Sequence, residues 1–275
     1  MQKSNPYLLL LLSCSFLFSL NSFSEIEVVY ESISHMKGSE LRAALSQLII
    51  SKHRPRSYGE LYDIFLESDL DQTYENDGSI QDMYSERAES IDPYVYRGQE
   101  QRCGDYTRES ACFNREHLFP QSIFEHKEPM RSDFHHIYPT DGFVNGKRRS
   151  LPFGEVAKAR WVSKNGSKIG ANTYGHYRGS VFEPINEFKG DIARALLYFG
   201  LRYQKEALNW KHPMIDSKNK KFYSGWFISL LLKWNRQDPV SKHENFRNNI
   251  GEKFQGNRNP FIDNPEWANL IWNNL

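Results

Sequence analysis

Apolar residues recur at helical spacing in three parts of the chain, and these parts predict its main helices. Residues 37–52 (KGSELRAALSQLIISK) follow a Gly-Ser start with apolar positions about one turn apart, namely Leu41, Ala44, Leu45, Leu48 and Ile49. We expect residues 58–66 to continue this helical region. Residues 191–203 (DIARALLYFGLRY) predict a second helix, and residues 226–234 (WFISLLLKW) predict a third that is buried.

The pattern is less regular elsewhere. Residues 71–112 are polar, are interrupted by Gly and Asp and contain short aromatic runs, which predicts loops and brief strands. Residues 113–185, rich in Gly, Asn and Pro, predict short strands joined by turns. The last 40 residues are polar, with turns expected at 257–260 and 264–265. Because no repeat or long linker divides the chain, we predict a single domain of the mixed α+β class.

The N-terminal 24 residues have a basic start, a charge-free apolar middle and a final run of small residues. Lys3 precedes the charge-free stretch 7–20, and Asn21-Ser-Phe-Ser24 follows it. This layout predicts a secretory signal peptide over residues 1–24 and a mature domain over residues 25–275. We therefore expect a secreted or periplasmic protein.

Two alternatives remain for this leader. It would serve as a membrane anchor if it were not cleaved, but its apolar run is short for a bilayer span. Leu11-Leu-Ser-Cys14 resembles a lipoprotein motif, although the apolar stretch before Cys14 is short. No later segment is apolar enough to cross a bilayer, so we expect no membrane span in the mature protein.

Composition indicates a globular protein, with 39% apolar and 14% aromatic residues among 275. Removing the leader leaves a formal charge near zero and two cysteines, Cys103 and Cys112. In an oxidising compartment these two most simply form one disulfide, which would close a small loop. A zinc pair is the alternative, but the cysteines lie farther apart than those of zinc knuckles.

The stretch FNREHLFP, residues 113–120, places Glu116 directly beside His117. In a strand the two side chains point to opposite faces, but at a strand end both can turn toward one site. An imidazole with an ordinary pKa near ~6.5 suits the deprotonation of water at neutral pH. Mg²⁺ needs only one or two carboxylate or amide oxygens, which Glu116 and Asn145 would supply. The ordinary alternative is a solvated Glu beside a packed His.

The segment 131–149 supplies further polar candidates: Asp133, His135, His136, Asp141 and Asn145. Each has an ordinary explanation alone, such as a turn or a hydrogen-bonded histidine, but together they favour a site. Hydrolysis of a phosphodiester needs a divalent cation, a base and cationic side chains that hold the backbone.

Four motifs in order resemble the bacterial endonuclease I family of secreted and periplasmic nucleases: FNREHLFPQS, SDFHHIYPTDGFVNGKRR, LPFGEV and LLKWNRQDPVS…QGNRNPFIDNPEW. The resemblance implies a ββα-metal (His-Me finger) core in which a strand-end histidine faces a metal held partly from the following helix. It makes His117 the general base and Glu116 and Asn145 the metal ligands. It also implies Mg²⁺-dependent cleavage of DNA, and often of RNA, with little sequence preference and 5′-phosphate ends. Ca²⁺ or Mn²⁺ are the expected substitutes.

The sequence departs from the family at one position of the chemistry. Some members carry a longer insertion that supplies a transition-state arginine, whereas here fifteen residues separate His117 from Asp133. The candidates by charge and proximity are Arg131, Arg148 and Arg149, of which we choose Arg131. We expect Asp133 and His135 to brace the metal site or to lie in its second shell, a role that is often structural.

The charge distribution favours a nucleic-acid partner more than the net charge does. Residues 142–170 hold seven Lys or Arg against one acid, Glu155. We expect Lys147, Arg148 and Arg149 to contact phosphates, which carry no sequence information. A solvated basic face is the ordinary alternative.

The leading prediction is a secreted Mg²⁺-dependent endonuclease that acts as a monomer on DNA, with RNA as a further substrate. A secreted nucleic-acid-binding protein with a structural metal site is the alternative, and an intact Glu116, His117 and Asn145 set weighs against it. A zinc hydrolase that uses His117, His135 or His136 is less favoured, because H-E-x-x-H and comparable ligand spacings are missing.

Overall fold

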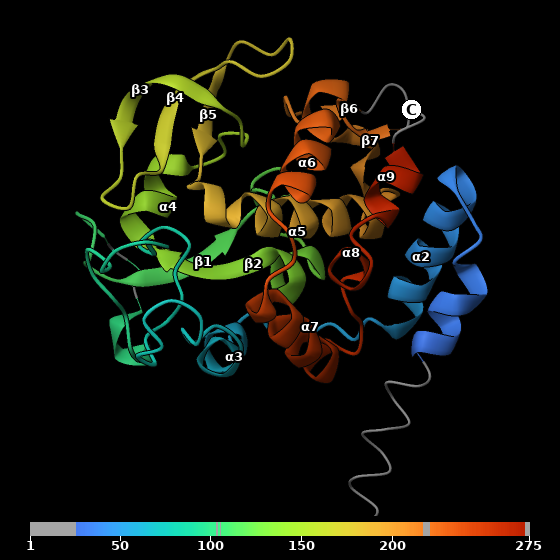
Figure 1. Cartoon of the computed structure of the whole chain (residues 1–275), viewed down its shortest axis with the longest axis horizontal. Helices are drawn as coiled ribbons and strands as arrows, with labels where there is room; N and C mark the ends of the chain where they lie inside the picture. Colours follow the sequence, from blue (N-terminus) through green and yellow to red (C-terminus); the bar gives the residue numbers. More distant parts are fainter. Residues whose placement is uncertain (1–25, 103, 105, 217–220, 273–275) are drawn as a thin grey trace, which may run out of the picture.

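The computed structural model describes residues 26–102, 104, 106–216 and 221–272 (Figure 1). The predicted signal peptide at 1–24 and Cys103 of the predicted disulfide lie outside these residues. Helices and small antiparallel sheets alternate along the chain, so the predicted α+β class is confirmed. None of the described helices is both long and apolar enough to cross a bilayer.

Helix α5 (Lys189–Arg202) runs through the middle of the molecule, between the β1–β2 hairpin and helix α6 (Gly225–Gln237) (Figure 1). Every residue from 190 to 201 is buried, so this helix is enclosed on all sides rather than on one face. Phe199 stacks on Phe119 with 4.3 Å between ring centroids. Because each large apolar side chain contributes roughly 1.5–3 kcal/mol on burial, α5 anchors the core.

Two helices precede the site in the chain. Helix α2 (Gly38–Lys52) buries Leu41, Leu45 and Ile49, as its apolar spacing predicts. The expected continuation over residues 58–66 is a separate helix, α3 (Leu61–Ser68), because Pro55 lies in the intervening segment and cannot continue a helix.

The site is built on a strand–strand–helix unit. Strand β1 (Phe113–His117) pairs antiparallel with β2 (Ile137–Asp141), with Glu116 opposite Tyr138 and His117 opposite Ile137. Helix α4 (Gly142–Arg148) follows β2 without a loop, and the Asp141 carboxylate caps it by accepting a hydrogen bond from the Val144 backbone N–H. This connection fixes α4 beside the end of the hairpin, as a ββα core requires.

Two smaller sheets complete the described strands. Strands β3 (Val156–Val162), β4 (Lys168–Asn172) and β5 (Ser180–Glu183) form an antiparallel sheet in chain order. Strands β6 (Ile215–Asp216) and β7 (Lys221–Tyr223) form a short hairpin next to α6 (Figure 1).

The turns predicted near 257–260 and 264–265 separate three helices that the sequence did not predict, namely α7 (Lys242–Gln255), α8 (Pro260–Asp263) and α9 (Trp267–Trp272). Helix α7 begins with a capping box, in which Ser241 and Glu244 bond each other's backbone N–H. Its buried side is largely polar and includes His243, Glu244, Arg247 and Asn248, so apolar spacing could not reveal it.

Helix α7 holds the start of the second strand of the site. The Arg247 guanidinium donates to the Ile137 carbonyl oxygen at 2.6 Å and to the Phe134 carbonyl oxygen at 3.2 Å. The same group pairs with the buried Asp69 carboxylate at 2.8 Å. The polar C-terminal motif therefore positions the hairpin from outside the ββα unit.

Candidate active site

A cavity of about 650 Å³ lies at the end of the hairpin. Strand β1 lines it with the four consecutive residues 114–117, and α4 contributes Asn145. Tyr58 and Tyr62, which precede and open α3, line it as well. The predicted base and both predicted metal ligands thus surround one space, because the ββα connection brings α4 back to the end of β1.

His117, the last residue of β1, is only 4% exposed. Its Nε2 lies 3.0 Å from the backbone carbonyl oxygen of Arg131. Because a carbonyl oxygen only accepts hydrogen bonds, Nε2 carries the proton and the lone pair of the neutral ring is on Nδ1. No described residue forms a hydrogen bond with Nδ1, so this nitrogen is free to accept a proton.

Burial lowers the pKa of His117 well below its usual range, and the neighbouring His136, Arg115 and Arg131 act in the same direction. The hydrogen bond to the Arg131 carbonyl opposes this shift. The imidazole is therefore neutral at neutral pH, which is the form that acts as a base.

Glu116 is buried, and its carboxylate uses its two oxygens differently. Oε1 accepts hydrogen bonds from the Tyr84 hydroxyl at 2.8 Å and from Nη1 of Arg148 at 2.6 Å. Oε2 has no hydrogen-bond donor among the described residues. One oxygen therefore orients the group and the other remains available for a cation.

The expectation that Arg148 contacts phosphate is corrected by its position, because its side chain is fully buried. Besides Glu116, its guanidinium donates to the His117 carbonyl oxygen at 2.9 Å and to the Leu118 carbonyl oxygen at 2.7 Å. It also lies over the Phe153 ring at 4.3 Å. Arg148 thus belongs to the interior that supports Glu116, not to the surface.

Asn145 lies across the cavity on α4. Its side-chain Nδ2 donates to Oδ1 of Asn114 at 2.7 Å, which leaves its own Oδ1 as a free acceptor. Asn114 and Glu116 share a face of β1 because they are two residues apart. A free carboxylate oxygen and a free amide oxygen at one cavity fit a hard divalent cation that keeps several waters, such as Mg²⁺.

Tyr58 lies between two arginines. The guanidinium carbons of Arg115 and Arg131 lie 3.4 and 4.1 Å from the centroid of its ring. Two groups this close to one centroid would overlap on the same face, so they occupy opposite faces. Arg115 also lies 4.2 Å from the Tyr62 ring, and its Nη1 donates to the Tyr58 carbonyl oxygen at 2.7 Å.

Arg115 and Arg131 differ in their relation to the cavity. Arg115 lines it, and its buried Nε has no hydrogen-bond partner. Arg131 is not among the lining residues, and its backbone carbonyl is the group that contacts His117. The transition-state arginine chosen from the sequence therefore supports the base through its main chain, while Arg115 presents a cation to the cavity.

Asp133 and His135 are buried away from the predicted metal ligands. The Asp133 carboxylate accepts hydrogen bonds from the hydroxyls of Tyr198 and Tyr203, each at 2.8 Å, and from the Gln255 amide at 2.9 Å. His135 Nε2 donates to the Asn257 carbonyl oxygen at 2.8 Å. No described contact joins either residue to Glu116 or Asn145, so the two anchor the chain between β1 and β2 to α5 and the C-terminal segment.

The predicted basic surface is present in part. Lys147 and Arg149 are exposed on either side of buried Arg148. A second hollow of about 640 Å³ is lined by Lys147 and Arg160, and shares Gly146, Arg149 and Ser150 with the first. A cationic surface therefore continues from the site along the end of α4.

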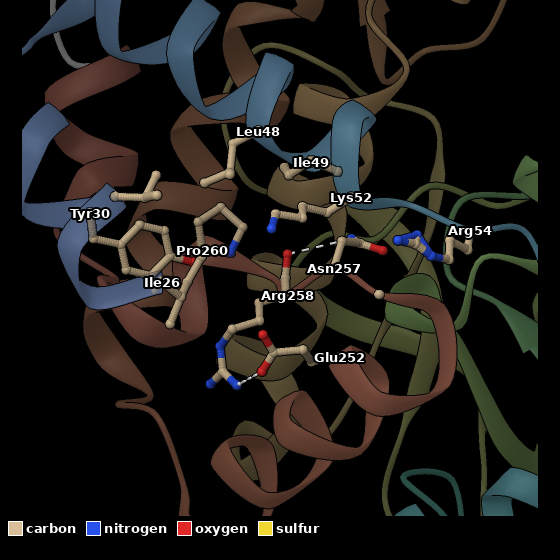
Figure 2. A pocket seen from close by; sticks show the side chains of 12 residues that line it. Ile26, Tyr30, Leu48, Ile49, Lys52, Arg54, Glu252, Asn257, Arg258 and Pro260 are labelled. Carbon is tan, nitrogen blue, oxygen red and sulfur yellow. Dashed lines mark hydrogen bonds and ion pairs between the residues drawn. The ribbon is translucent and has the colours of Figure 1, made fainter. Parts of the chain in front are cut away.

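Another pocket, of about 250 Å³, lies between α2 and the segment 252–260 (Figure 2). It shares no lining residue with the cavity around His117. Its Arg258 is paired with Glu252 at 2.9 Å and with Asp263 at 2.6 Å. We assign the chemistry to the cavity around His117. Of these two spaces, it is the one that brings together a candidate base and free ligand oxygens.

Sequence reasoning missed two contributors to this site, Tyr84 and Arg115, and it favoured His135 over His136 as a supporting residue. Tyr84 lies thirty-two residues before its partner Glu116, so no local pattern links them. The centroid of the His136 ring lies 5.7 Å from that of the His117 ring. The sequence pattern gave no reason to prefer His136 over its neighbour His135. Arg115 alone had a signal, since it stands inside the FNREHLFP stretch.

Comparison with known proteins agrees with this geometry. The family model described as Endonuclease I matches residues 37–266. An extracellular ribonuclease of Bacillus amyloliquefaciens is 34% identical over 90% of this chain and 79% of its own length. An extracellular ribonuclease of Bacillus subtilis is 31% identical over 91% of this chain and 80% of its own length. An extracellular deoxyribonuclease of Aeromonas hydrophila is 30% identical over 49% of this chain and 50% of its own length.

The family match covers most of the chain, including the hairpin, α4 and the C-terminal helices that hold them. The relatives are named for activity on nucleic acid, and the family is generally metal-dependent, in keeping with free ligand oxygens beside a neutral histidine. The chain belongs to the endonuclease I family and is a nuclease.

Proposed function

We propose that this protein is a secreted or periplasmic endonuclease that uses Mg²⁺ to hydrolyse RNA and DNA with little sequence preference. The observation that carries the proposal is the cavity in which Nδ1 of His117, Oε2 of Glu116 and Oδ1 of Asn145 are all without hydrogen-bond partners among the described residues. Export is supported by the leader pattern and by the extracellular or periplasmic names of the relatives.

In this proposal His117 is the general base. Its Nδ1 removes a proton from water, and the resulting hydroxide attacks phosphorus and breaks the P–O3′ bond. The products are a 5′-phosphate and a 3′ oxygen, which takes a proton from solvent water and becomes a 3′-hydroxyl. The Arg131 carbonyl oxygen accepts a hydrogen bond from Nε2–H and stabilises the imidazolium that forms. A positioned base of this kind contributes roughly 10²–10⁴-fold to the rate.

Glu116 and Asn145 would hold the cation, which would neutralise charge on the phosphate and the leaving oxygen. Arg148 and Tyr84 act on Glu116 rather than on the substrate. Their hydrogen bonds to Oε1 fix the orientation of the carboxylate. Oε2 could therefore bind the cation without a further loss of side-chain conformational entropy.

We assign the contact with the scissile phosphate to Arg115, in place of Arg131. The two tyrosine rings and the Tyr58 carbonyl fix its guanidinium, and Nη2, which has no hydrogen-bond partner among the described residues, is free to donate to a phosphate oxygen. Lys147 and Arg149 would hold flanking phosphates on the adjoining surface. Contacts of this kind read no bases, which accounts for weak sequence preference.

RNA is included as a substrate because two of the similar proteins are named extracellular ribonucleases. A site that contacts phosphates alone lacks the 2′-hydroxyl contact by which proteins tell RNA from DNA. A monomer suffices for this activity, because the predicted base and both predicted ligands lie within one chain.

The test is incubation of residues 25–275 with plasmid DNA and with single-stranded RNA, in Mg²⁺ and in chelator. We expect cleavage of both in Mg²⁺, none in chelator, and 5′-phosphate ends. His117→Ala serves as the matched control, because it should bind both substrates without cutting them. Binding without cleavage by the unmodified protein would instead support a nucleic-acid-binding protein with a structural metal site.

A further inference from the structure

A second group of acidic side chains lies outside the cavity around His117. Glu75, Glu86 and Asp92 each place a carboxylate oxygen within 4.8 Å of the other two. Glu75 is exposed, Asp92 is half-buried and Glu86 is 1% exposed. None of the three lines the cavity of the active site.

Glu86 is the unusual member of this acidic cluster. Its Oε1 is buried without a hydrogen-bond partner, and its side-chain hydrogen bond is with Asp92, another acid of the cluster. A buried carboxylate normally accepts several hydrogen bonds or faces a cationic side chain, because an uncompensated buried charge costs several kcal/mol. Glu86 faces no cationic side chain among the described residues, and its hydrogen-bond partner Asp92 is itself an acid.

The groups around Glu86 further disfavour its charged form. Burial raises the pKa of Glu86 to about 10, and the neighbouring charges of Asp92, Glu75 and Asp71 act in the same direction. Burial also raises the pKa of Asp92 to about 6. In the absence of a cation, the cluster would hold a proton at neutral pH to relieve this repulsion.

The loop is nevertheless fixed in the conformation that brings the acids together. The Asp71 carboxylate accepts hydrogen bonds from the backbone N–H groups of residues 73, 74 and 76, which shapes the turn that carries Glu75. The Asp92 Oδ1 accepts from the Arg87 backbone N–H at 2.8 Å. The carboxylate oxygens of the cluster are therefore held near one another, and in the absence of a cation their shared donor is the proton between Glu86 and Asp92.

We propose that Glu75, Glu86 and Asp92 form a second cation site, independent of the active site, and that this site takes Ca²⁺. Three carboxylates with oxygen–oxygen distances up to 4.8 Å suit an ion with ligand distances of about 2.3–2.6 Å and irregular coordination. Mg²⁺ is less suited, because it requires near-octahedral geometry at about 2.0–2.1 Å. Solvent at exposed Glu75 would supply the remaining ligands.

The site would stabilise the segment that carries Tyr84. Backbone hydrogen bonds from residues 85 and 86 to the Asp82 carbonyl form one turn, so Glu86 and Tyr84 move together. Asn165 also donates to the carbonyl oxygens of Met83 and Glu86. Through the Tyr84 hydroxyl this turn reaches Glu116 at 2.8 Å, and only this last consequence rests on the proposed function.

The test uses the mature chain, freed of metal with chelator and then titrated with Ca²⁺ by calorimetry and by thermal unfolding. Glu86→Gln removes the buried charge with little change of shape, and Glu89→Gln is the control, an exposed acid three residues away. We expect Glu86→Gln to bind one Ca²⁺ fewer than Glu89→Gln. At about 100 times its Kd, Ca²⁺ should raise the Tm of Glu89→Gln by roughly 5–10 °C more than that of Glu86→Gln.

Glu75→Gln provides a second variant at an exposed position, where folding is not at stake. It should weaken the same binding event at least about tenfold, which is what the loss of even an outer partner of a metal costs. Equal Ca²⁺ stoichiometry and equal Tm response in Glu86→Gln and Glu89→Gln would overturn the proposal, and would indicate a protonated Glu86. Because the readout is a difference in bound ions, it holds whether or not the protein cleaves nucleic acid.

Discussion

At the scale of single residues, adjacent Glu116 and His117 are fixed from opposite directions. Arg148 and Tyr84 hold the carboxylate from the interior, whereas the Arg131 carbonyl holds the imidazole from the chain that follows β1. Each side chain keeps one free atom as a result. This arrangement explains why Arg148 is buried next to the site. Without Arg148, Oε1 of Glu116 would keep only the Tyr84 hydroxyl as a hydrogen-bond donor.

Arg148 is therefore expected to contribute to stability, and Arg149 is not. Arg148→Met should lower the free energy of unfolding in chelator by about 3–5 kcal/mol, because it leaves a buried carboxylate without its counter-charge. Arg149→Met, at the exposed neighbouring position, should change it by less than about 0.5 kcal/mol. Urea denaturation measures both. Equal losses in the two variants would show that the ion pair does not hold Glu116.

The depressed pKa of His117 predicts the acid limb of the pH profile. The neutral imidazole is present above its pKa and is lost as the pH falls through it. Burial and nearby cations place this pKa well below the usual ~6.5. As the pH is lowered, kcat/KM should therefore stay constant past pH ~6.5 and decline only at more acidic pH. An acid limb centred at or above the ordinary histidine pKa would contradict the environment described for this residue.

At the scale of elements, the sequence predicted those whose burial follows apolar spacing. Helices α2, α5 and α6 were located within a few residues, because each buries aliphatic or aromatic side chains along its length. Helix α7 was missed because it buries Arg247 and Glu244 against other polar groups. Helix α4 is about two turns long, ends in Lys and Arg and has no apolar stripe, so it was implied by the family resemblance alone.

The residues of the site also fall into those that the sequence could predict and those that it could not. The placement of His117, Glu116 and Asn145 around one cavity could be predicted because they stand in motifs, and their roles stay predictions. The roles of Arg148, Asp133 and His135 could not, since each depends on whether its side chain points into the core or toward the cavity. That choice is decided by residues more than thirty positions away, such as Tyr84 and Gln255.

Asp133 is predicted to act on the fold and not on the chemistry. Asp133→Asn replaces an acceptor of four hydrogen bonds by a group that must donate, so the free energy of unfolding should fall by about 1–3 kcal/mol. Well below its Tm, the folded variant should keep a turnover within a few-fold of the unmodified protein. A loss of turnover as large as that of His117→Ala, in a variant that is fully folded, would instead place Asp133 in the reaction.

At the scale of the whole molecule, a near-neutral protein binds a polyanion through a local surface. The formal net charge is +1, but the two connected hollows next to α4 are lined by Arg115, Arg149, Lys147 and Arg160. Binding should therefore depend strongly on salt and little on base sequence.

This expectation can be measured on His117→Ala, which removes cleavage from the assay. Adding Lys147→Ala and Arg149→Ala should flatten the slope of log affinity against log salt by up to roughly two units on duplex DNA, about 0.9 for each phosphate contact. The loss should be equal on two unrelated sequences. Lys253→Ala, an exposed lysine outside both hollows, is the control and should leave the slope unchanged. A loss confined to one sequence would mean that these side chains read bases.

The central claim is that Glu116 and Asn145 hold the cation while His117 accepts the proton, and the Mg²⁺ dependence of single-turnover cleavage separates these roles. Asn145→Ala and Glu116→Ala should shift the curve to higher Mg²⁺ concentration, because each removes one of few protein ligands. His117→Ala should leave the midpoint nearly unchanged and lower the plateau by roughly two to four orders of magnitude. An unchanged midpoint in both ligand variants, or an unchanged plateau in folded His117→Ala, would contradict the assignment of the site.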